Sequence, residues 1–381
     1  MVVILEILRG LAALWVFVFH VKDSIFLLDS TSIFYRFLDM GYLGVPMFFV
    51  ISGYVITFSA ESHISSNKSP LVFIKKRLWR VYPTLCFSIF LIVLLPVIFE
   101  FLSLIKTGNF SSPLVTINEN LQKYSLFEWA NVFLLTKIFW QQYDSLAGEF
   151  AGVNTVYWSL AIEVQFYFVV ALMMCFKQHF KKLVFCVSIL SLASVLFPIP
   201  LNDGFFLKFW LPFSFGIVVA YLVKAERVPF SSGVTPLYLM VCVGYTMICI
   251  VFFYKFSPND MTLGVDLGNL LFSLLFGVGL VLLYPIEVSL VTFNKTRVGL
   301  FLLRPFLILG SMSYSVYLLH TKLYVIATSF TNKIFETKTI EFGMVTILLT
   351  LILCYPVYYF IEKKFMSSNL KSIGVCQTSC R

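Results

Sequence analysis

The sequence predicts an all-α, polytopic membrane protein with about ten transmembrane helices and both termini in the cytoplasm. Hydrophobic residues make up 59% of the chain and charged residues 12%, whereas soluble globular domains are nearer half apolar and a quarter charged. Apolar runs long enough to cross a bilayer recur along the whole chain. The cationic residues gather in every second linker between these runs, and this pattern sets membrane orientation.

The apolar runs of spanning length define the predicted helices. They lie near residues 4–21, 42–59, 78–102, 156–176, 183–200, 205–223, 234–254, 266–285, 305–329 and 341–361. The linkers rich in Lys and Arg are 60–80, 177–182, 224–230, 286–304 and the C-terminal tail. All of them fall on one side of a chain with ten spans, and by the positive-inside rule this side is the cytoplasm.

The longest linker, 103–155, is predicted to be external. Within it, the stretch FEWANVFLLTKIFW at 127–140 is apolar but too short to span. We expect an interfacial or re-entrant helix there, with Trp129 and Trp140 at the level of the lipid headgroups. Counting this stretch as a span would break the alternation of charge in every later linker.

The chain is expected to form one membrane domain, 1–366, and a cytoplasmic tail, 367–381. Its net charge of +9 follows the topology pattern, so membrane lipid is the expected partner and nucleic acid is not. Six of the eight cysteines lie in apolar runs, where Cys behaves as a small hydrophobe. Cys376 and Cys380 have no His or second Cys pair beside them, so neither a disulfide framework nor a metal site is predicted.

The first apolar run, LEILRGLAALWVFVFH at 5–20, carries three ionisable residues. Arg9 and His20 are eleven residues apart, which on an α-helix is about three turns and about 16 Å of rise, on the same face. Glu6 precedes Arg9 by three residues, within pairing reach. An arginine inside a membrane helix costs several kcal/mol unless it faces protein, water or a partner, so this helix is predicted to be functional.

Two later spans carry polar residues at a depth similar to that of His20. Ser159, Glu163 and Tyr167 form a stripe with a spacing of four in the outer half of the fourth span.

The ninth span reads GSMSYSVYLLH and places Ser313, Tyr317 and His320 on one face. A histidine and a carboxylate that meet form an acid–base pair, and His20 with Glu163 is the expected pair. The alternative is that each residue only makes a hydrogen bond between helices.

The entry to the third span, IKKRLWRVYP at 74–83, is cationic. Arg77 and Arg80 are three residues apart and, with Lys76, form a face suited to phosphate. The alternative is a topology signal that also binds anionic lipid.

The segment GYLGVPMFFVISGYVIT at 41–57 is rich in glycine, at Gly41, Gly44 and Gly53. Small residues let neighbouring helices approach closely, so packing is the expected role. Pro46 is expected to kink or start this span.

These segments together resemble the acyltransferase-3 membrane family. The resemblance rests on the Arg–x10–His pattern of the first span and on FFVISGY, KRLWRVYP, WSLAIE and SYSVYLLH, in order from about residue 4 to 362. The stretch PVYYFIEKKFM at 356–366 resembles the closing segment of the family. It implies transfer of an acyl group, usually acetyl, from cytoplasmic acetyl-CoA to a hydroxyl of an envelope glycan, in the inner membrane of a bacterium. The O-antigen of lipopolysaccharide is the leading acceptor by family frequency.

The resemblance also implies roles for residues of this chain. Arg9 and His20 match the essential Arg and His of the family, Arg77 and Arg80 match its donor-side Arg-x-x-Arg motif, and Glu163 matches its WSL-segment glutamate. Many members have Asp where this chain has Pro46, so a carboxylate role is not available at that position. Longer members carry an appended esterase-like domain, and this sequence implies either complete transfer within the membrane or a separate partner.

The hypothesis from the sequence is that Arg9, Lys76, Arg77 and Arg80 hold the donor and that its thioester end threads inward to His20. His20 then acts as a general base oriented by Glu163, or is itself transiently acylated. A set of residues is expected to line the acceptor path: Ser159, Tyr314, Tyr317 and His320.

The rival function is an ion-coupled transporter or flippase of a glycan precursor. The expected spans lack the paired broken helices that would favour transport. The sequence leaves open the oligomeric state, the acyl chain length and whether Glu6 or Glu163 is the partner of His20.

Overall fold

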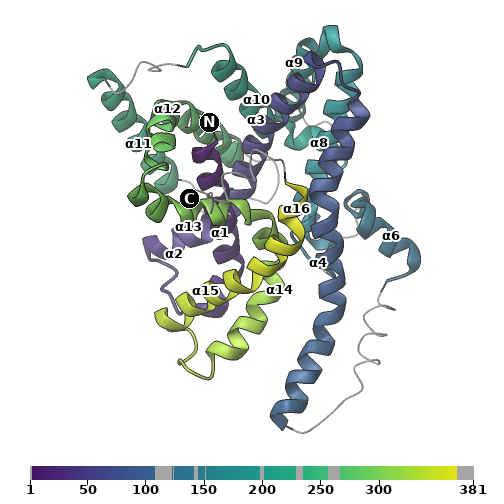
Figure 1. Cartoon of the computed structure of the whole chain (residues 1–381), viewed down its shortest axis with the longest axis vertical. Coiled ribbons are helices and arrows are strands. Elements are labelled where there is room, and N and C mark those ends of the chain that lie inside the picture. Colours follow the sequence, from purple (N-terminus) through teal and green to yellow (C-terminus); the bar gives the residue numbers. More distant parts are fainter. Residues whose placement is uncertain are drawn as a thin grey trace, which may run out of the picture.

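The computed structural model describes residues 2–107, 122, 124–140, 145–150, 152–197, 201–228, 235–255 and 267–366. All regular elements in these ranges are helical (Figure 1). The α-helices are α1 (Val3–Ile25), α2 (Ile33–Asp39), α3 (Gly44–Ser65), α4 (Pro70–Thr107), α6 (Leu126–Leu134), α7 (Leu146–Glu149), α8 (Tyr157–Cys175), α9 (Phe180–Leu196), α10 (Trp210–Lys224), α11 (Pro236–Lys255), α12 (Leu267–Phe293), α13 (Arg297–Ser311), α14 (Ser313–Thr331), α15 (Ile340–Val357) and α16 (Lys363–Phe365). Short 3₁₀ turns are η1 (Met40–Leu43), η2 (Lys137–Phe139), η3 (Lys177–His179) and η4 (Phe206–Phe209), and η6 (Tyr358–Glu362) is a π-helix.

The number of membrane-spanning helices agrees with the sequence prediction. Nine helices of the described chain are long and apolar enough to cross a membrane, or ten if the bent pair α13–α14 counts as one span. The prediction of an all-α, multi-pass membrane protein is therefore confirmed. The predicted tail, 367–381, lies outside the described residues.

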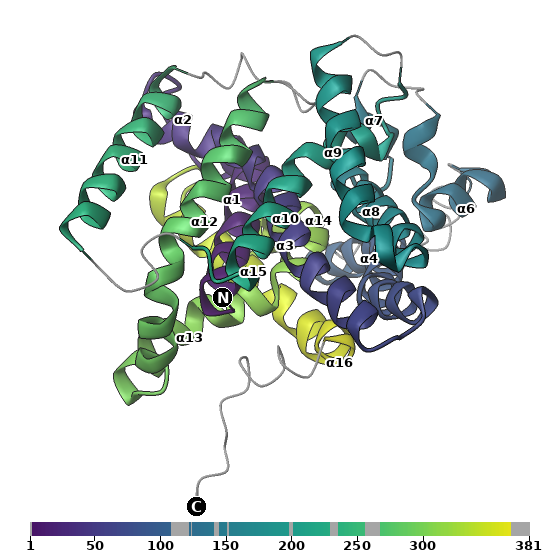
Figure 2. The ribbon, with the colours of Figure 1, turned by 90° about the horizontal axis from the view of Figure 1, so that it is seen from above.

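Helix α1 lies in the interior of the bundle, where Figure 2 shows it surrounded by other helices. It packs against α3, α13 and α14, and Ala12, Ala13, Val16 and Phe17 are fully buried. By contrast, α11 lies at the periphery and buries only Tyr238 and Phe252. A helix that is largely apolar on all sides suits the interior of a membrane bundle; Glu6 and Lys22 of α1 are buried in protein, whereas His20 and Asp23 are exposed.

Glycines allow the closest helix crossings. A Cβ atom at Gly53 would lie 2.0 Å from the Phe213 carbonyl oxygen, and one at Gly216 would lie 1.8 Å from that of Val50. The backbones of α3 and α10 therefore touch, as small residues permit in membrane helices. The packing role predicted for Gly53 is confirmed.

The predicted continuous span at 305–329 is wrong, because the chain bends by 71° between α13 and α14. Gly310, Ser311 and Ser313 surround the break at Met312, and glycine and serine are weaker helix formers than alanine or leucine. The Glu362 carboxylate accepts a hydrogen bond from the Ser315 backbone N–H at 3.0 Å. The break leaves the Ser315 backbone N–H without a partner in its own helix, and Glu362 supplies the missing acceptor.

The third span also differs from its predicted boundaries. Helix α4 begins at Pro70, eight residues before the expected start, and continues to Thr107 (Figure 1). Proline is tolerated in the first turn of a helix because its missing N–H would be unpaired there. The cationic segment therefore lies on α4 itself, one to three turns from the start of the helix.

The apolar stretch in the long linker forms α6, a helix of nine residues. A capping box starts it, in which Ser125 and Glu128 each bond the backbone N–H of the other. The Ser125 backbone N–H and hydroxyl hold the pKa of Glu128 below its ordinary value. The helix ends at Leu134, and the C-cap residue Leu135 adopts a left-handed conformation with φ 59°. Nine residues are too few to span, as the sequence predicted.

Candidate active site

The N-terminal part of α1 holds a buried ion pair. Arg9 Nη2 lies 2.6 Å from Glu6 Oε2, so the predicted pairing is confirmed. Arg9 Nε also donates to the Gly310 carbonyl at 3.4 Å. This contact is possible because Gly10 and Gly310 bring α1 and α13 together, with a Cβ at Gly310 only 2.0 Å from the Glu6 carbonyl oxygen. Arg9 therefore faces protein, beside the break between α13 and α14.

Three turns further along α1, His20 meets His320 of α14. His20 Nδ1 lies 3.3 Å from His320 Nε2, and the ring centroids are 5.0 Å apart. His320 is fully buried, whereas the His20 side chain is exposed. The structure thus joins two histidines that are 300 positions apart in the sequence.

The hydrogen bonds of the histidine pair assign a tautomer to each ring. His20 Nδ1 lies 2.8 Å from the Val16 carbonyl oxygen, and His320 Nδ1 lies 3.0 Å from that of Val316. A carbonyl oxygen only accepts, so in the neutral rings each Nδ1 carries the proton. His320 Nε2 then shares the single Nδ1 proton of His20 with the Val16 carbonyl, as the longer of the two contacts. Among the described residues no hydrogen bond engages His20 Nε2, so its lone pair is available. An exposed imidazole with this tautomer has the form that a general base needs.

Helix α8 holds α14 in place next to the histidines. The Tyr317 hydroxyl lies 2.5 Å from Ser159 Oγ, which brings together two residues predicted for the acceptor path. Asn154, just before α8, donates to the Leu318 carbonyl at 2.7 Å and accepts from Thr321 Oγ1 at 3.0 Å. Asn154 is 1% exposed and was not predicted, because nothing in its local sequence marks a contact 164 residues away.

The expected pairing of Glu163 with His20 is not the arrangement that the structure shows. Glu163 Oε1 accepts from Ser52 Oγ and from the Tyr167 hydroxyl, both at 2.8 Å. The predicted stripe on α8 is therefore real, but its carboxylate faces α3, and the partner of His20 is His320. One turn of helix separates Glu163 from Ser159, and this turn sets the carboxylate apart from the histidines.

The predicted donor-side cations lie near Glu163 on α4. Arg77 interacts electrostatically with Tyr167, Glu163 and Arg80, and its guanidinium stacks over the Phe73 ring at 5.6 Å. Within the described part of the chain, no hydrogen bond or ion pair occupies Arg77 or Arg80. Their N–H groups are thus available to an anion.

The other two residues expected at these sites differ in their surroundings. Lys76 is exposed on the same helix as the arginines. Tyr314, expected on the acceptor path, donates its hydroxyl to the Val81 carbonyl at 3.0 Å. It therefore ties α14 to α4 beside the arginines.

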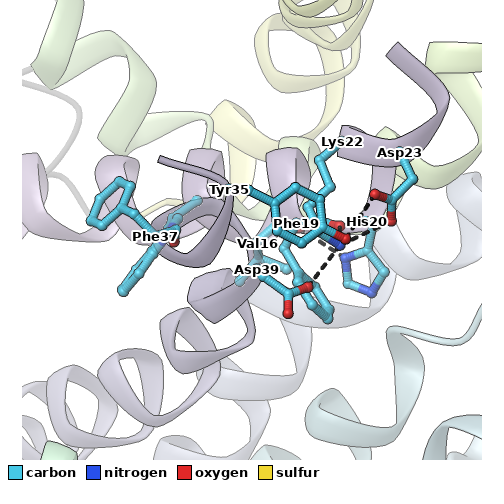
Figure 3. Close-up of polar contacts among 9 residues, drawn as sticks. Val16, Phe19, His20, Lys22, Asp23, Tyr35, Phe37 and Asp39 are labelled. Atoms are coloured by element: carbon cyan, nitrogen blue, oxygen red, sulfur yellow. Dashed lines mark hydrogen bonds and ion pairs between the residues drawn. The ribbon is translucent and has the colours of Figure 1, made fainter. Parts of the chain in front are cut away.

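A polar cluster that the sequence analysis missed lies at the C-terminal end of α1 (Figure 3). Lys22, which is 6% exposed, pairs with Asp39 at 2.8 Å and Asp23 at 3.0 Å. The Tyr35 hydroxyl donates to Asp23 at 3.0 Å. These contacts fix α1 to α2 and η1 two residues beyond His20. Only Asp23 shares a helix with Lys22, so helical spacing did not reveal the cluster.

The geometry is thus a histidine pair, a buried Arg–Glu pair on the same helix and two unpaired arginines on α4. The model of the acyltransferase-3 family, described as "Acyltransferase domain", matches residues 2–359. The chain belongs to the acyltransferase-3 family. This membership confirms the resemblance recognised in the sequence motifs.

Individual relatives in the acyltransferase-3 family agree with this assignment. The chain is similar to a protein of Staphylococcus aureus strain COL named "Putative O-acetyltransferase SACOL0978", with 25% identity over 97% of the chain and 58% of the relative. It is also similar to "O-acetyltransferase OatA" of S. aureus strain NCTC 8325, with 24% identity and the same coverage. The chain therefore spans less than two thirds of the length of these relatives. No solved structure matches it with statistical significance.

Proposed function

We propose that this protein is a membrane O-acetyltransferase that moves an acetyl group from cytoplasmic acetyl-CoA to a hydroxyl of a cell-surface polysaccharide, such as O-antigen. Family membership and the names of the relatives support acyl transfer to oxygen. The observation that carries the proposal is the exposed His20 ring, whose Nε2 is left free by the hydrogen bonds of its Nδ1. The proposed location is the inner membrane of a bacterium.

The donor is proposed to enter beside α4. CoA is a multiply charged anion, and guanidinium groups bind phosphate through paired, charge-assisted hydrogen bonds. Arg77 and Arg80 are unpaired among the described residues, and Lys76 is exposed on the same helix. Arg9 lies about 16 Å from His20 along α1, so the thioester end of the donor would extend from the arginines toward the histidine pair.

The proposed reaction is direct transfer. His20 Nε2 takes the proton of the acceptor hydroxyl while the hydroxyl oxygen attacks the thioester carbonyl carbon. The carbon–sulfur bond then breaks, and the CoA thiolate leaves and recovers the proton from His20. Throughout these steps, the contact of His20 Nδ1 with Val16 and His320 keeps the ring oriented.

A covalent relay is the variant mechanism, in which His20 Nε2 attacks the thioester carbonyl and the carbon–sulfur bond breaks to release the CoA thiolate. The acceptor hydroxyl then attacks the acetyl-histidine, the carbon–nitrogen bond breaks, and the hydroxyl proton passes to the thiolate. Rapid quenching with labelled acetyl-CoA separates the two mechanisms. An acetyl-protein that forms in the parent chain and is absent from His20→Ala supports the relay. Full transfer with no trapped acetyl-protein supports direct transfer.

Transport without chemistry is the competing function. The break between α13 and α14 favours it, since transporters bind substrate at discontinuous membrane helices. In transporters such helices occur as a related pair in two repeats, whereas the described chain contains one bent pair. Movement of a glycan precursor in vesicles that lack acetyl-CoA would establish transport.

Acetylation of the surface glycan tests the proposal directly. The parent chain and His20→Ala are expressed at equal membrane levels in a host that lacks the gene, and the glycan is analysed by mass spectrometry. We expect an added acetyl mass that mild base removes, with a decrease of at least about 100-fold in the variant. Equal acetylation in both strains would exclude His20 as the base, and no acetylation in either would exclude this acceptor.

A further inference from the structure

The start of α14 is capped by a carboxylate from a different part of the chain. Glu362, in the π-helix η6, accepts from the Ser315 backbone N–H at 3.0 Å and from Ser315 Oγ at 2.6 Å. The first backbone N–H groups of a helix have no intrahelical partner, and an anion is stabilised beside them. Glu362 thus fixes the position of the first turn of α14, the helix that carries Tyr317 and His320.

The same carboxylate lies on η6, which packs against α4, the helix that carries Arg77 and Arg80, as well as against α14. Glu362 is 2% exposed and interacts electrostatically with the guanidinium groups of Arg80 and Arg9. Its second oxygen, Oε1, is buried with no hydrogen-bond partner in the described part of the chain. One buried carboxyl group therefore contacts α14 directly and acts on Arg80 and Arg9, two of the four cations predicted to hold the donor.

We propose that Glu362 is a positioning residue that links the donor-binding arginines to the histidine pair, an inference that rests on the proposed function. The carboxylate fixes the start of α14 through Ser315, and its charge orients Arg80, whereas Arg9 is held by Glu6 and the Gly310 carbonyl. Donor phosphates and Glu362 then act on the same Arg80 guanidinium group. Removal of the charge weakens the hold on α14 and also removes the repulsion between Glu362 and the anionic donor.

Opposite effects of one substitution on CoA affinity and on kcat would distinguish this role from simple helix capping. For Glu362→Gln, whose side-chain oxygen can still accept from Ser315, we expect CoA to bind about threefold more tightly because a nearby like charge is gone. We expect kcat for acetyl transfer to fall about tenfold because His320 is held less firmly. A residue that only caps a helix would not change the affinity for CoA.

Two variants act as matched controls. Ser315→Ala removes a hydrogen bond of the cap and keeps the charge of Glu362, so the affinity for CoA should stay unchanged while kcat falls. Glu287 caps α1 in the same manner, with Oε1 accepting from Val3 N–H at 2.9 Å and Oε2 from Ile4 N–H at 3.0 Å. Glu287→Gln therefore removes a capping charge from another helix, and it should leave the affinity for CoA unchanged.

The experiment measures CoA binding by calorimetry on the purified full chain and acetyl transfer in membranes. If Glu362→Gln does not fold, Glu362→Asp replaces it, and we expect unchanged CoA affinity with reduced kcat. Equal CoA affinity in the parent and Glu362→Gln, whether or not kcat falls, would overturn the inference while the proposed function stands. If the parent chain itself does not bind CoA, the proposed donor and the inference both fail.

Discussion

At the scale of single residues, His20 and His320 have different roles in the pair. His20 is exposed and its Nε2 is free, whereas His320 is buried and both of its nitrogens are engaged. In the proposed reaction the buried ring would therefore orient the exposed one and would not itself meet the substrate. This assignment differs from the sequence expectation, which placed His320 on the acceptor path and gave the orienting role to Glu163.

The different roles lead to a graded prediction for the histidines. His320→Ala should lower kcat about 10-fold to 100-fold, because His20 remains present but is oriented less firmly. The loss should be smaller than that in His20→Ala, and KM for acetyl-CoA should change little. Initial rates of acetyl transfer in membranes with matched protein levels measure the difference. A larger loss for His320→Ala than for His20→Ala would reverse the two roles.

The unpaired arginines lead to a prediction about the donor. Arg77→Ala and Arg80→Ala should each raise KM for acetyl-CoA by about tenfold, because each removes a charge-assisted contact to phosphate. KM for the acceptor should stay the same, since the histidine pair is not touched. Lys76→Ala provides the comparison on the exposed face of α4, with a weaker effect expected. If both substitutions leave KM for acetyl-CoA unchanged, the arginines serve topology or lipid binding.

The residues that the sequence predicts and those that it does not predict differ in how far along the chain their contact partners lie. Glu6 with Arg9, and Glu163 with Tyr167, are pairs at helical spacing, and these pairs follow from periodicity alone. Asn154, Glu287 and Glu362 act on helices far away in the chain, so no local pattern reveals them. Glu163 was expected at His20 because both lie in the outer half of a span, and depth does not determine which face of a helix meets which neighbour.

At the scale of elements, the crossing of α1 and α13 relies on two glycines in contact. A Cβ atom at Gly310 would lie 2.0 Å from the Glu6 carbonyl oxygen and 2.9 Å from its Cγ. The crossing places Arg9 beside the Gly310 carbonyl and precedes the break that starts α14. The positions of both histidine-bearing helices therefore depend on this contact.

Gly310→Ala should consequently destabilise the protein and reduce transfer. Overpacking of a close contact typically costs about 1–3 kcal/mol, and the helices must separate to relieve it. Gly244→Ala is the matched control, because Gly244 lies in another apolar helix and a Cβ there meets no atom within 4 Å. Thermal unfolding in detergent, followed by size-exclusion chromatography, compares the variants. Equal transition temperatures for both would show that α1 and α13 separate without cost.

The break between α13 and α14 was the main error in the predicted elements. The apolar run at 305–329 has the length of one span, and hydropathy alone does not distinguish a straight helix from a bent pair. The signal was present in the sequence as Gly310, Ser311 and Ser313, which are poor helix formers. The carboxylate that stabilises the new helix start comes from position 362, and this contribution is visible only in the fold.

At the scale of the whole molecule, the order of the sites along the bundle matches a reaction across a membrane. Glu6 and Arg9 lie near the start of α1, and the histidine pair lies about three helical turns further along the same helix. The cluster of Lys22, Asp23 and Asp39 follows beyond His20. A donor from one side and an acceptor from the other would thus meet at His20, provided that the two ends of α1 face opposite sides.

The orientation of the bundle is therefore the prediction on which the transfer direction depends. The turns after α3 and after α12 should be cytoplasmic, and the turn between α14 and α15 should be external, because the cations gather in the first two. Asn67→Cys, Asn294→Cys and Lys338→Cys place single thiols at these turns, in a chain whose native cysteines are replaced by alanine. A membrane-impermeant thiol reagent should label only Lys338→Cys in intact cells, and all three after the membranes are opened. Labelling of Asn67→Cys from outside would place the arginines of α4 away from cytoplasmic acetyl-CoA, and the proposed direction of transfer would then be wrong even if the histidine pair is the catalytic centre.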